Sequence, residues 1–314
     1  MTVQHDITPD TRPQFAALLA QCENLDPLRT AVVCPHEATA LEGALDAAGL
    51  GLITPVLVGE RALIEQTATE AGLDIAGLEI VEAEGESGAA HKAVDLAASG
   101  EVAALMKGYL HSDTYLAAVI RKENGLRTKQ RTSHCFVMDV PNYPRPLIIT
   151  DAALNVAPDV KQRLAIAQNA VNLALALGIE EPKVAILSAT ETPSEAVPSS
   201  IDAREIAAQA QAGAVTGGLV DGPFALDNAV SAEAAELKGI DSPVGGKADV
   251  LVVPTVEAGN IFFKALTFLG GAETSGLVVG AAVPVILTSR ADSAEARIAS
   301  AALAVLYGRF LRDG

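Results

Sequence analysis

A hydroxyl, a guanidinium and a carboxylate stand close together near the C-terminal end of the sequence: Ser289, Arg290 and Asp292. They follow residues 283–287, an apolar run typical of a buried strand. An arginine offers paired donors to a phosphate or carboxylate, and a hydroxyl can donate a hydrogen bond to a charge that develops during a reaction. Asp292 or Ser293 can also cap the helix expected to follow. This strand end is therefore a candidate catalytic or anion-binding site.

A second candidate site begins in the apolar run 248–253 and ends in a polar cluster. Glu257, Gly259, Asn260 and Lys264 follow this run, where a strand is expected to pass into a helix. In open α/β sheets, ligands bind outside the carboxyl ends of the strands. Glycine permits close approach of the backbone, and the first helical turn presents free N–H groups to an anion.

Two further strand ends carry polar residues. Lys107 and Gly108 follow the apolar run 102–106 and precede an expected helix, an arrangement that suits phosphate binding. A lysine on a surface turn explains the same pattern equally well. Asp221 follows a short strand and precedes Gly222-Pro223, and here a structural turn is the better explanation.

Basic residues gather between an expected helix and the strand after it. They are Arg121, Lys122, Arg127, Lys129 and Arg131. A solvated charge run is the default interpretation. If the run borders a cleft, it suits a phosphorylated adenine nucleotide such as coenzyme A.

Composition narrows the class of protein. The chain of 314 residues fits about two domains, and its 50% apolar content without tryptophan suits helices packed on parallel strands. The formal net charge of −17 argues against nucleic acid as a partner. The three cysteines lack paired spacing, and the sequence shows neither an export signal nor an apolar run long enough for a membrane span. We therefore expect a cytoplasmic protein with reduced thiols and no membrane contact.

Short β-branched runs alternate with helix-length segments, which predicts a βαβ architecture with a mainly parallel sheet. The expected strands lie near 31–34, 55–59, 78–81, 102–106, 134–138, 147–150, 184–188, 218–220, 250–253, 276–279 and 283–287. The expected helices include 37–49, 60–72, 87–99, 110–123, 158–177 and 294–311. Three prolines in segment 140–146 predict a crossing between domains, with the final helix returning to the first. The expected domains are 1–145 with 290–314, and 146–289.

Common nucleotide and metal motifs are missing from the sequence. Gly49 and Gly51 follow a helix and lack the third glycine of the dinucleotide fingerprint, and Gly245-Gly246-Lys247 lacks the remainder of a P-loop. The five histidines have no metal-ligand spacing, and dispersed carboxylates are more often caps or solvated charges than Mg²⁺ ligands. The sequence therefore predicts no metal site.

Together, the polar strand ends resemble the phosphate acetyltransferase/phosphate butyryltransferase family. The matching segments are Lys107-Gly108, 125–128, Ser133-His134, Asp221-Gly222-Pro223, 248–254, 257–260, Lys264 and 284–293. They extend from about residue 102 to the C-terminus, while the first hundred residues agree mainly in pattern. Segments 133–141 and 143–147 are especially similar to the phosphotransacetylase-like domain fused behind an enoyl-CoA hydratase domain in some bacterial proteins. No hydratase region is present in this sequence.

The resemblance implies two three-layer α/β/α domains with a cleft between them, as in isocitrate/isopropylmalate dehydrogenases, and a homodimer. It implies the reaction acyl-CoA + phosphate = acyl phosphate + CoA, with an acetyl or another short chain, by direct attack in a ternary complex and without a cofactor or metal. Ser289 would stabilise the oxyanion or the leaving thiolate, and Arg290 would hold phosphate. Phosphate and acyl binding fall to Lys107, Gly108, Asp221, Glu257, Gly259, Asn260, Lys264 and Asp292. Coenzyme A binding falls to Arg121, Arg127, Thr128 and Ser133.

Two departures from the family pattern keep an alternative open. Acetyl-specific members carry an additional arginine where this chain has Thr267 and Phe268, and the acidic residue after the Ser-Arg pair corresponds to either Asp292 or Glu295. The alternative to an enzyme is a non-catalytic module that binds acyl-CoA or acyl phosphate. A metal- and nucleotide-dependent dehydrogenase of the same fold is disfavoured because its dinucleotide and carboxylate signatures are missing.

Overall fold

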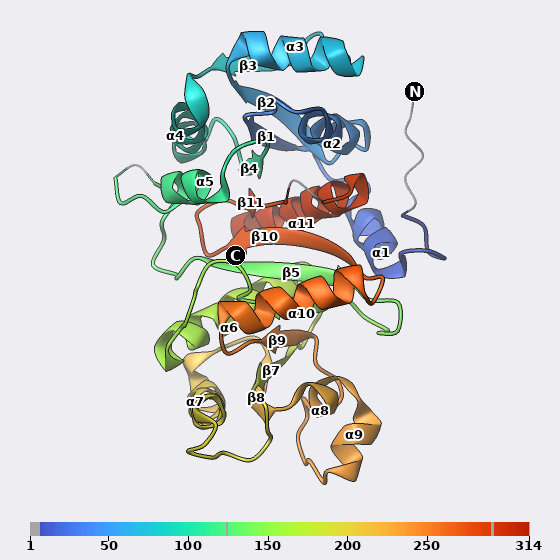
Figure 1. Cartoon of the computed structure of the whole chain (residues 1–314), viewed down its shortest axis with the longest axis vertical. Helices are drawn as coiled ribbons and strands as arrows, with labels where there is room; N and C mark the ends of the chain where they lie inside the picture. The colour runs from blue at the N-terminus through green and yellow to red at the C-terminus, as the bar shows by residue number, and fades with distance from the viewer. Residues whose placement is uncertain (1–6, 124, 290–291, 314) are drawn as a thin grey trace. The chain divides into compact units, whose positions relative to one another are not determined.

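The computed structural model describes residues 7–123, 125–289 and 292–313, coloured by position in the chain in Figure 1. These residues form two compact units. Unit 1 comprises the described residues up to Lys129 and from Ser275 onward, and unit 2 comprises Gln130–Thr274.

The strands of unit 1 follow the order β3-β2-β1-β4-β11-β10. Their bounds are β1 Leu28–Val33, β2 Ile53–Gly59, β3 Glu79–Glu82, β4 Ala104–Lys107, β10 Glu273–Val279 and β11 Val285–Ile286, with the first two residues of β10 in unit 2. Neighbouring strands are parallel from β3 to β11, whereas β10 runs antiparallel to β11. Strands β4 and β11 are fully buried, which explains why they appear in the sequence as continuous apolar runs.

Helices cover both faces of the unit 1 strands. Their bounds are α1 Pro13–Cys22, α2 Ala38–Gly49, α3 Arg61–Ala71, α4 Gly85–Ala98, α5 Ser112–Val119 and α11 Ala294–Asp313. Helices α4 and α5 pack together on one side of the strands, and α2 packs with α11 on the other (Figure 1). The loops that follow β1, β2, β4 and β11 therefore share one edge of this layer.

The strands of unit 2 follow the order β5-β6-β9-β7-β8. Their bounds are β5 Ser133–Asp139, β6 Leu147–Thr150, β7 Lys183–Leu187, β8 Leu219–Phe224 and β9 Val250–Val252. Strands β6, β9, β7 and β8 are parallel, and β5 is antiparallel to β6. The helices are α6 Val160–Ala176, α7 Pro198–Gln209 with a π-helical turn at 210–214, α8 Leu226–Val230, α9 Ala232–Leu237 and α10 Val256–Phe268.

Helix α6 shows how the sequence sets its ends. Asp159 is the N-cap, and its Oδ1 accepts a hydrogen bond of 2.8 Å from the Gln162 amide while Gln162 Oε1 accepts one of 3.2 Å from the Asp159 amide. Pro158 thus precedes the cap, instead of lying in the first turn as predicted. At the other end Gly178 has a φ of 85°, the left-handed conformation that favours glycine after a helix.

The chain crosses between the two units at positions other than those predicted from the prolines. The chain leaves unit 1 after Lys129 and returns after Thr274, whereas the sequence placed the crossings at 145 and 289. Segment 140–146 is the turn between the antiparallel strands β5 and β6, inside unit 2. Prolines suit such a turn as well as a linker because neither requires their missing N–H group.

The mixed α/β class with mainly parallel pairing is confirmed. Antiparallel pairs occur at β5-β6 and β10-β11, each joining strands that are consecutive in sequence. Among the described residues, the helices lack the combination of length and apolar character that a membrane crossing requires.

Candidate functional site

Lys107 is a buried cation at the carboxyl end of β4. Its residue is 3% exposed, and its Nζ lies 3.4 Å from the Gly108 carbonyl oxygen. The Gly108 amide donates to the Val33 carbonyl of neighbouring β1 at 2.8 Å. A Cβ at position 108 would lie 2.4 Å from that same oxygen, so the close contact requires glycine. Burial rules out the alternative of a lysine on a surface turn.

Ser289 follows β11, the strand beside β4. The parallel register places Val285 beside Leu105 and Ile286 beside Met106, so Ser289 and Lys107 leave the same edge of two adjacent strands. The strand pairing thus places a serine and a lysine that are far apart in sequence at the same edge of unit 1. Ser289 is exposed, and its amide donates to Asp292 Oδ2 at 2.6 Å. Arg290, the predicted partner of Ser289, lies outside the described residues.

The same edge of unit 1 carries titratable residues that the sequence reasoning missed. Glu86 accepts hydrogen bonds of 2.9 Å from both the amide and Nδ1 of His111. His36 has a buried Nε2 without a hydrogen-bond partner among the described residues. Burial lowers the pKa of His36, and the carboxylates of Glu60 and Glu86 oppose that shift. The sequence could have indicated two of these residues, because His36 follows β1 and Glu60 follows β2, as the other candidate residues follow their strands.

Part of the basic run has partners within unit 1. Arg121 forms an ion pair with Asp95 of α4. The Thr128 hydroxyl donates to the Gly280 carbonyl at 2.8 Å, and Arg127 forms an isolated bridge with Ala281. Arg127 is exposed beside this turn, where its guanidinium is available to an anionic ligand.

In unit 2, the loop after β6 forms a polar network that the sequence reasoning missed. Asp151 is 2% exposed, and its Oδ1 accepts hydrogen bonds of 2.9 Å from the amides of Ala153 and Leu154. Its Oδ2 accepts from the His134 amide at 3.1 Å and from Asn155 Nδ2 at 2.5 Å. The signal was an aspartate directly after the buried run 147–150, the same pattern that identified the other candidates.

The network continues from Asn155 to a basic side chain. Asn155 Oδ1 accepts from Arg131 Nε at 2.6 Å, and Arg131 is exposed. The buried carboxylate of Asp151 therefore orients, through one amide, a guanidinium at the surface. A group of this kind can bind phosphate through its remaining N–H donors.

The first turn of α10 lies against this loop. Thr255 caps the helix, and Asn260 Nδ2 lies 3.5 Å from the Ala152 carbonyl oxygen. A Cβ at Gly259 would lie 2.7 Å from the Cβ of Ala152, so the glycine serves close packing of the helix on the loop. Glu257 is exposed in the same turn. Asn260 and Glu257 thus lie near the Asp151 network.

Three other predicted site residues of unit 2 have different surroundings. Lys264 is exposed, with its Nζ 5.8 Å from the centroid of the Phe263 ring. Asp221 lies within β8, two strands from β9, where it accepts hydrogen bonds from Ser242 Oγ at 2.6 Å and from the Gly222 amide at 2.8 Å. The Ser133 hydroxyl is buried and accepts from Asn169 Nδ2 at 2.9 Å. These hydrogen bonds to other protein groups indicate structural roles for Asp221 and Ser133.

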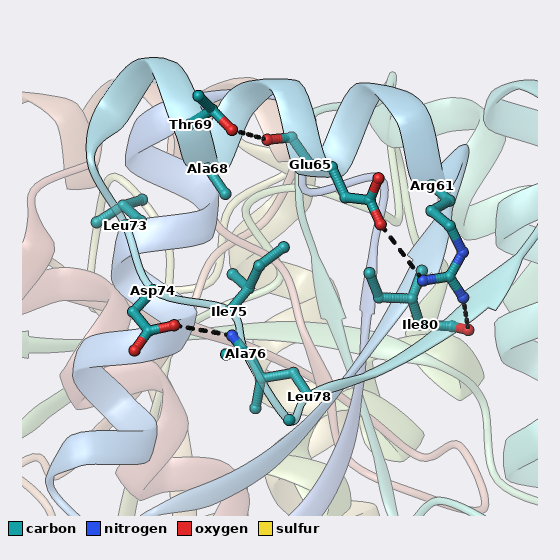
Figure 2. A pocket seen from close by; sticks show the side chains of 11 residues that line it. Arg61, Glu65, Ala68, Thr69, Leu73, Asp74, Ile75, Ala76, Leu78 and Ile80 are labelled. Carbon is teal, nitrogen blue, oxygen red and sulfur yellow. Dashed lines mark hydrogen bonds and ion pairs between the residues drawn. The ribbon is translucent and has the colours of Figure 1, made fainter.

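A pocket of about 450 Å³ lies beside α3 of unit 1 (Figure 2). Arg61 donates to the Ile80 carbonyl at 3.1 Å and pairs with Glu65, while Asp74 Oδ1 accepts from the Ala76 amide at 2.9 Å. The pocket is partly lined by the loop that precedes β3, at the amino end of an edge strand. It extends along α3 from Arg61, shortly after the carboxyl end of β2, to the amino end of β3. Among the described residues, no three histidine, cysteine, aspartate or glutamate side chains converge as metal ligands would.

Residues 86–305 match the sequence model of the phosphate acetyl/butaryl transferase family. The chain belongs to this family. It is similar to a phosphate acetyltransferase of Rhizobium meliloti, with 48% identity over 299 residues covering 95% of each chain. It is 39% identical over 292 residues to a phosphate butyryltransferase of Clostridium beijerinckii, which covers 93% of this chain and 97% of that one.

A solved structure extends the family comparison to three dimensions. The crystal structure of a branched-chain phosphotransacylase from Enterococcus faecalis matches with a TM-score of 0.78 and 31% identity, covering 90% of this chain and 99% of the other. The phosphate acetyl/butaryl transferase match includes Lys107, the Asp151 loop, the start of α10 and Ser289. The family resemblance deduced from the sequence is confirmed.

Proposed function

We propose that this member of the family transfers an acyl group between coenzyme A and inorganic phosphate. The observation that carries the proposal is the position of Ser289, an exposed residue shortly after β11, beside the strand that ends in the buried Lys107. A hydroxyl beside a fixed positive charge suits a reaction in which an anion attacks a carbonyl. Relatives named phosphate acetyltransferase and phosphate butyryltransferase support the same chemistry.

In the proposed reaction, a phosphate oxygen attacks the thioester carbonyl carbon while both substrates are bound. A C–O bond forms, the C–S bond breaks, and coenzyme A leaves as the thiolate. Ser289 donates a hydrogen bond to the oxyanion or to the departing thiolate, while Arg290 and Lys107 hold phosphate. Arg131 is a further candidate for phosphate or coenzyme A, because Asn155 orients its guanidinium. The step uses only the two substrates, and we propose that it needs no cofactor.

The family resemblance leads us to propose two three-layer domains flanking a substrate cleft, as in isocitrate/isopropylmalate dehydrogenases. We propose the cytoplasm as the compartment, because Cys22, Cys34 and Cys135 are free thiols. Burial raises the pKa of Cys22 to about 11. Burial is also the main reason why the pKa values of Cys34 and Cys135 rise to about 12, so all three thiols are protonated at neutral pH.

Release of free thiol from a series of acyl-CoA esters tests the reaction and its chain-length preference together. We expect acetyl-, propionyl- and butyryl-CoA to release coenzyme A thiol only when phosphate is present, with acyl phosphate formed in equal amount. Longer acyl-CoA esters should react more slowly. Binding of acyl-CoA without phosphate-dependent thiol release from any ester would instead establish the non-catalytic module.

We further propose that two copies of the chain associate through the outer face of α10. Ile261 and Phe268, seven residues apart on one side of the helix, are 70% and 73% exposed, and Leu269, the residue directly after the helix, is 87% exposed. Their burial in a dimer would contribute about 1.5 kcal/mol or more per side chain. Such an apolar stripe is unusual on a surface that stays in water.

Replacing Phe268 by glutamate should convert the dimer to a monomer at micromolar concentration, because a carboxylate would be buried in the interface. Light scattering after size-exclusion chromatography measures the mass directly. Leu237→Glu is the matched control, since Leu237 is 81% exposed but lies on α9, and it should leave the mass unchanged. A wild-type monomer, or a dimeric Phe268→Glu variant, would contradict this interface.

A further inference from the structure

A buried arginine of α11 reaches the strand end that carries Ser289. Arg297 is 3% exposed, and its Nη2 donates to the Ser289 carbonyl oxygen at 3.1 Å. Its Nη1 donates to Thr288 Oγ1, also at 3.1 Å. One planar guanidinium thus spans two consecutive residues, a geometry that arginine can supply and lysine cannot.

The path of this side chain depends on a glycine in α2. A Cβ at Gly43 would lie 2.4 Å from Cδ of Arg297 and 3.2 Å from its Cβ. The small residue therefore provides the space through which the arginine passes between α2 and α11. A larger residue at position 43 would displace the aliphatic part of Arg297 while leaving its guanidinium chemically intact.

Asp292 and Glu37 act electrostatically on the Arg297 guanidinium. The two hydrogen bonds described above go instead to the Thr288 hydroxyl and the Ser289 carbonyl. Burial lowers the pKa of Arg297, while Asp292 and Glu37 oppose the shift. Asp292 also accepts the hydrogen bond from the Ser289 amide at 2.6 Å. The backbone of Ser289 is therefore held on both sides, through its N–H by Asp292 and through its C=O by Arg297.

We infer that Arg297 is a positioning residue that fixes the Ser289 backbone so that its hydroxyl faces the reacting carbonyl. The inference rests on the proposed function, because it assigns Ser289 the stabilisation of the oxyanion or thiolate. Arg297 is enclosed by α2, α11 and the end of β11, so it acts through Ser289 instead of touching a substrate. The competing interpretation is that Arg297 only ties α11 to the strand and contributes stability.

Kinetics of Arg297→Lys, Arg297→Met and Gly43→Ala separate the two interpretations. We expect kcat to fall by about 100-fold in Arg297→Met, since displacement of a catalytic group by about 1 Å has that effect. The KM values should change little. Arg297→Lys should recover only part of kcat, and Gly43→Ala should lower kcat although every hydrogen-bonding group remains. Gly43→Ala also provides the test if the Arg297 variants fail to fold.

A matched control and a double variant complete the design. Arg163 of α6 is 2% exposed and paired with Asp202 of α7, so Arg163→Lys should lower stability but leave kcat unchanged. In a Ser289→Ala background, Arg297→Met should cause no further loss of kcat, because the Ser289 hydroxyl that Arg297 positions is already missing. The inference would be overturned if Arg297→Met lowered kcat equally with and without the Ser289 hydroxyl. It would also be overturned if folded Arg297→Met and Gly43→Ala enzymes kept the wild-type kcat. Either result would leave the proposed function standing. A wild-type enzyme without phosphate-dependent thiol release would refute the proposed function and this inference together.

Discussion

Replacing Ser289 by alanine should lower kcat by about 100- to 1000-fold, the effect of removing one hydrogen-bond donor from a developing oxyanion, or about 2.7 to 4 kcal/mol of transition-state stabilisation. The KM values for acyl-CoA and phosphate should change little, because the hydroxyl acts mainly after the substrates are bound. Initial rates of phosphate-dependent thiol release over a range of both substrates give these constants. The exposure of Ser289 means that the substitution leaves no cavity in the core.

Two variants show whether the loss comes from the hydroxyl itself. Ser289→Thr keeps a hydroxyl and should retain more activity than Ser289→Ala. Ser231→Ala removes the N-cap of α9, whose Oγ accepts from the Ala234 amide at 3.2 Å, so it should cost about 1 kcal/mol of stability but no kcat. A Ser289→Ala enzyme with kcat within about twofold of wild type, less than 1 kcal/mol, would exclude Ser289 as the donor.

Replacing Asp151 by asparagine should lower the free energy of unfolding by about 3 kcal/mol, because each buried donor left without an acceptor costs about 1 to 3 kcal/mol. Both carboxylate oxygens accept two hydrogen bonds in the structure. An asparagine side chain has one oxygen, so in either orientation its NH₂ group faces two donors. Urea unfolding followed by circular dichroism measures the change.

The same substitution should alter catalysis through Arg131. Where the asparagine NH₂ group takes the place of Oδ2, it faces the NH₂ group of Asn155 and that hydrogen bond is lost. Asn155 then no longer orients the Arg131 guanidinium, and we expect KM for phosphate or acyl-CoA to rise by about tenfold, or 1.4 kcal/mol. Asp74→Asn is the matched control, since Asp74 is exposed and accepts from the Ala76 amide in unit 1; its stability should change by about 0.5 kcal/mol at most. An unchanged unfolding midpoint for Asp151→Asn would contradict the network.

The strands were predictable where burial on both faces left a continuous apolar run. Segments 55–59 and 147–150 match β2 and β6 closely, and the helix predicted at 158–177 corresponds to α6. The ends of β8 and β10 were not predictable, since the sequence placed them at 218–220 and 276–279 while they extend over Leu219–Phe224 and Glu273–Val279. Polar residues within β8, including Asp221, interrupt the apolar run, although its backbone still pairs with β7.

Some residues of the candidate site could be named from the sequence, but others were missed. Lys107 and Ser289 were identified because each follows an apolar run, and the same pattern at Asp151 went unused. Arg297 had no comparable signal. It lies eight residues after Ser289 in the middle of a helical pattern, where its long stem makes it indistinguishable from a solvated arginine. Its burial depends on Gly43, more than 250 residues away in the sequence.

The sequence by itself determined the α/β class and the family, and it supplied candidate residues for binding phosphate and a thioester, because burial periodicity and residue chemistry are local properties. The tertiary structure decided which of these residues are neighbours. Pairing of β11 with β4 brings Ser289 and Lys107 to one edge, and the antiparallel turn of β5 and β6 places His134 beside Asp151. Strand order depends on contacts between distant segments, and a single sequence carries no local record of which buried runs will pair.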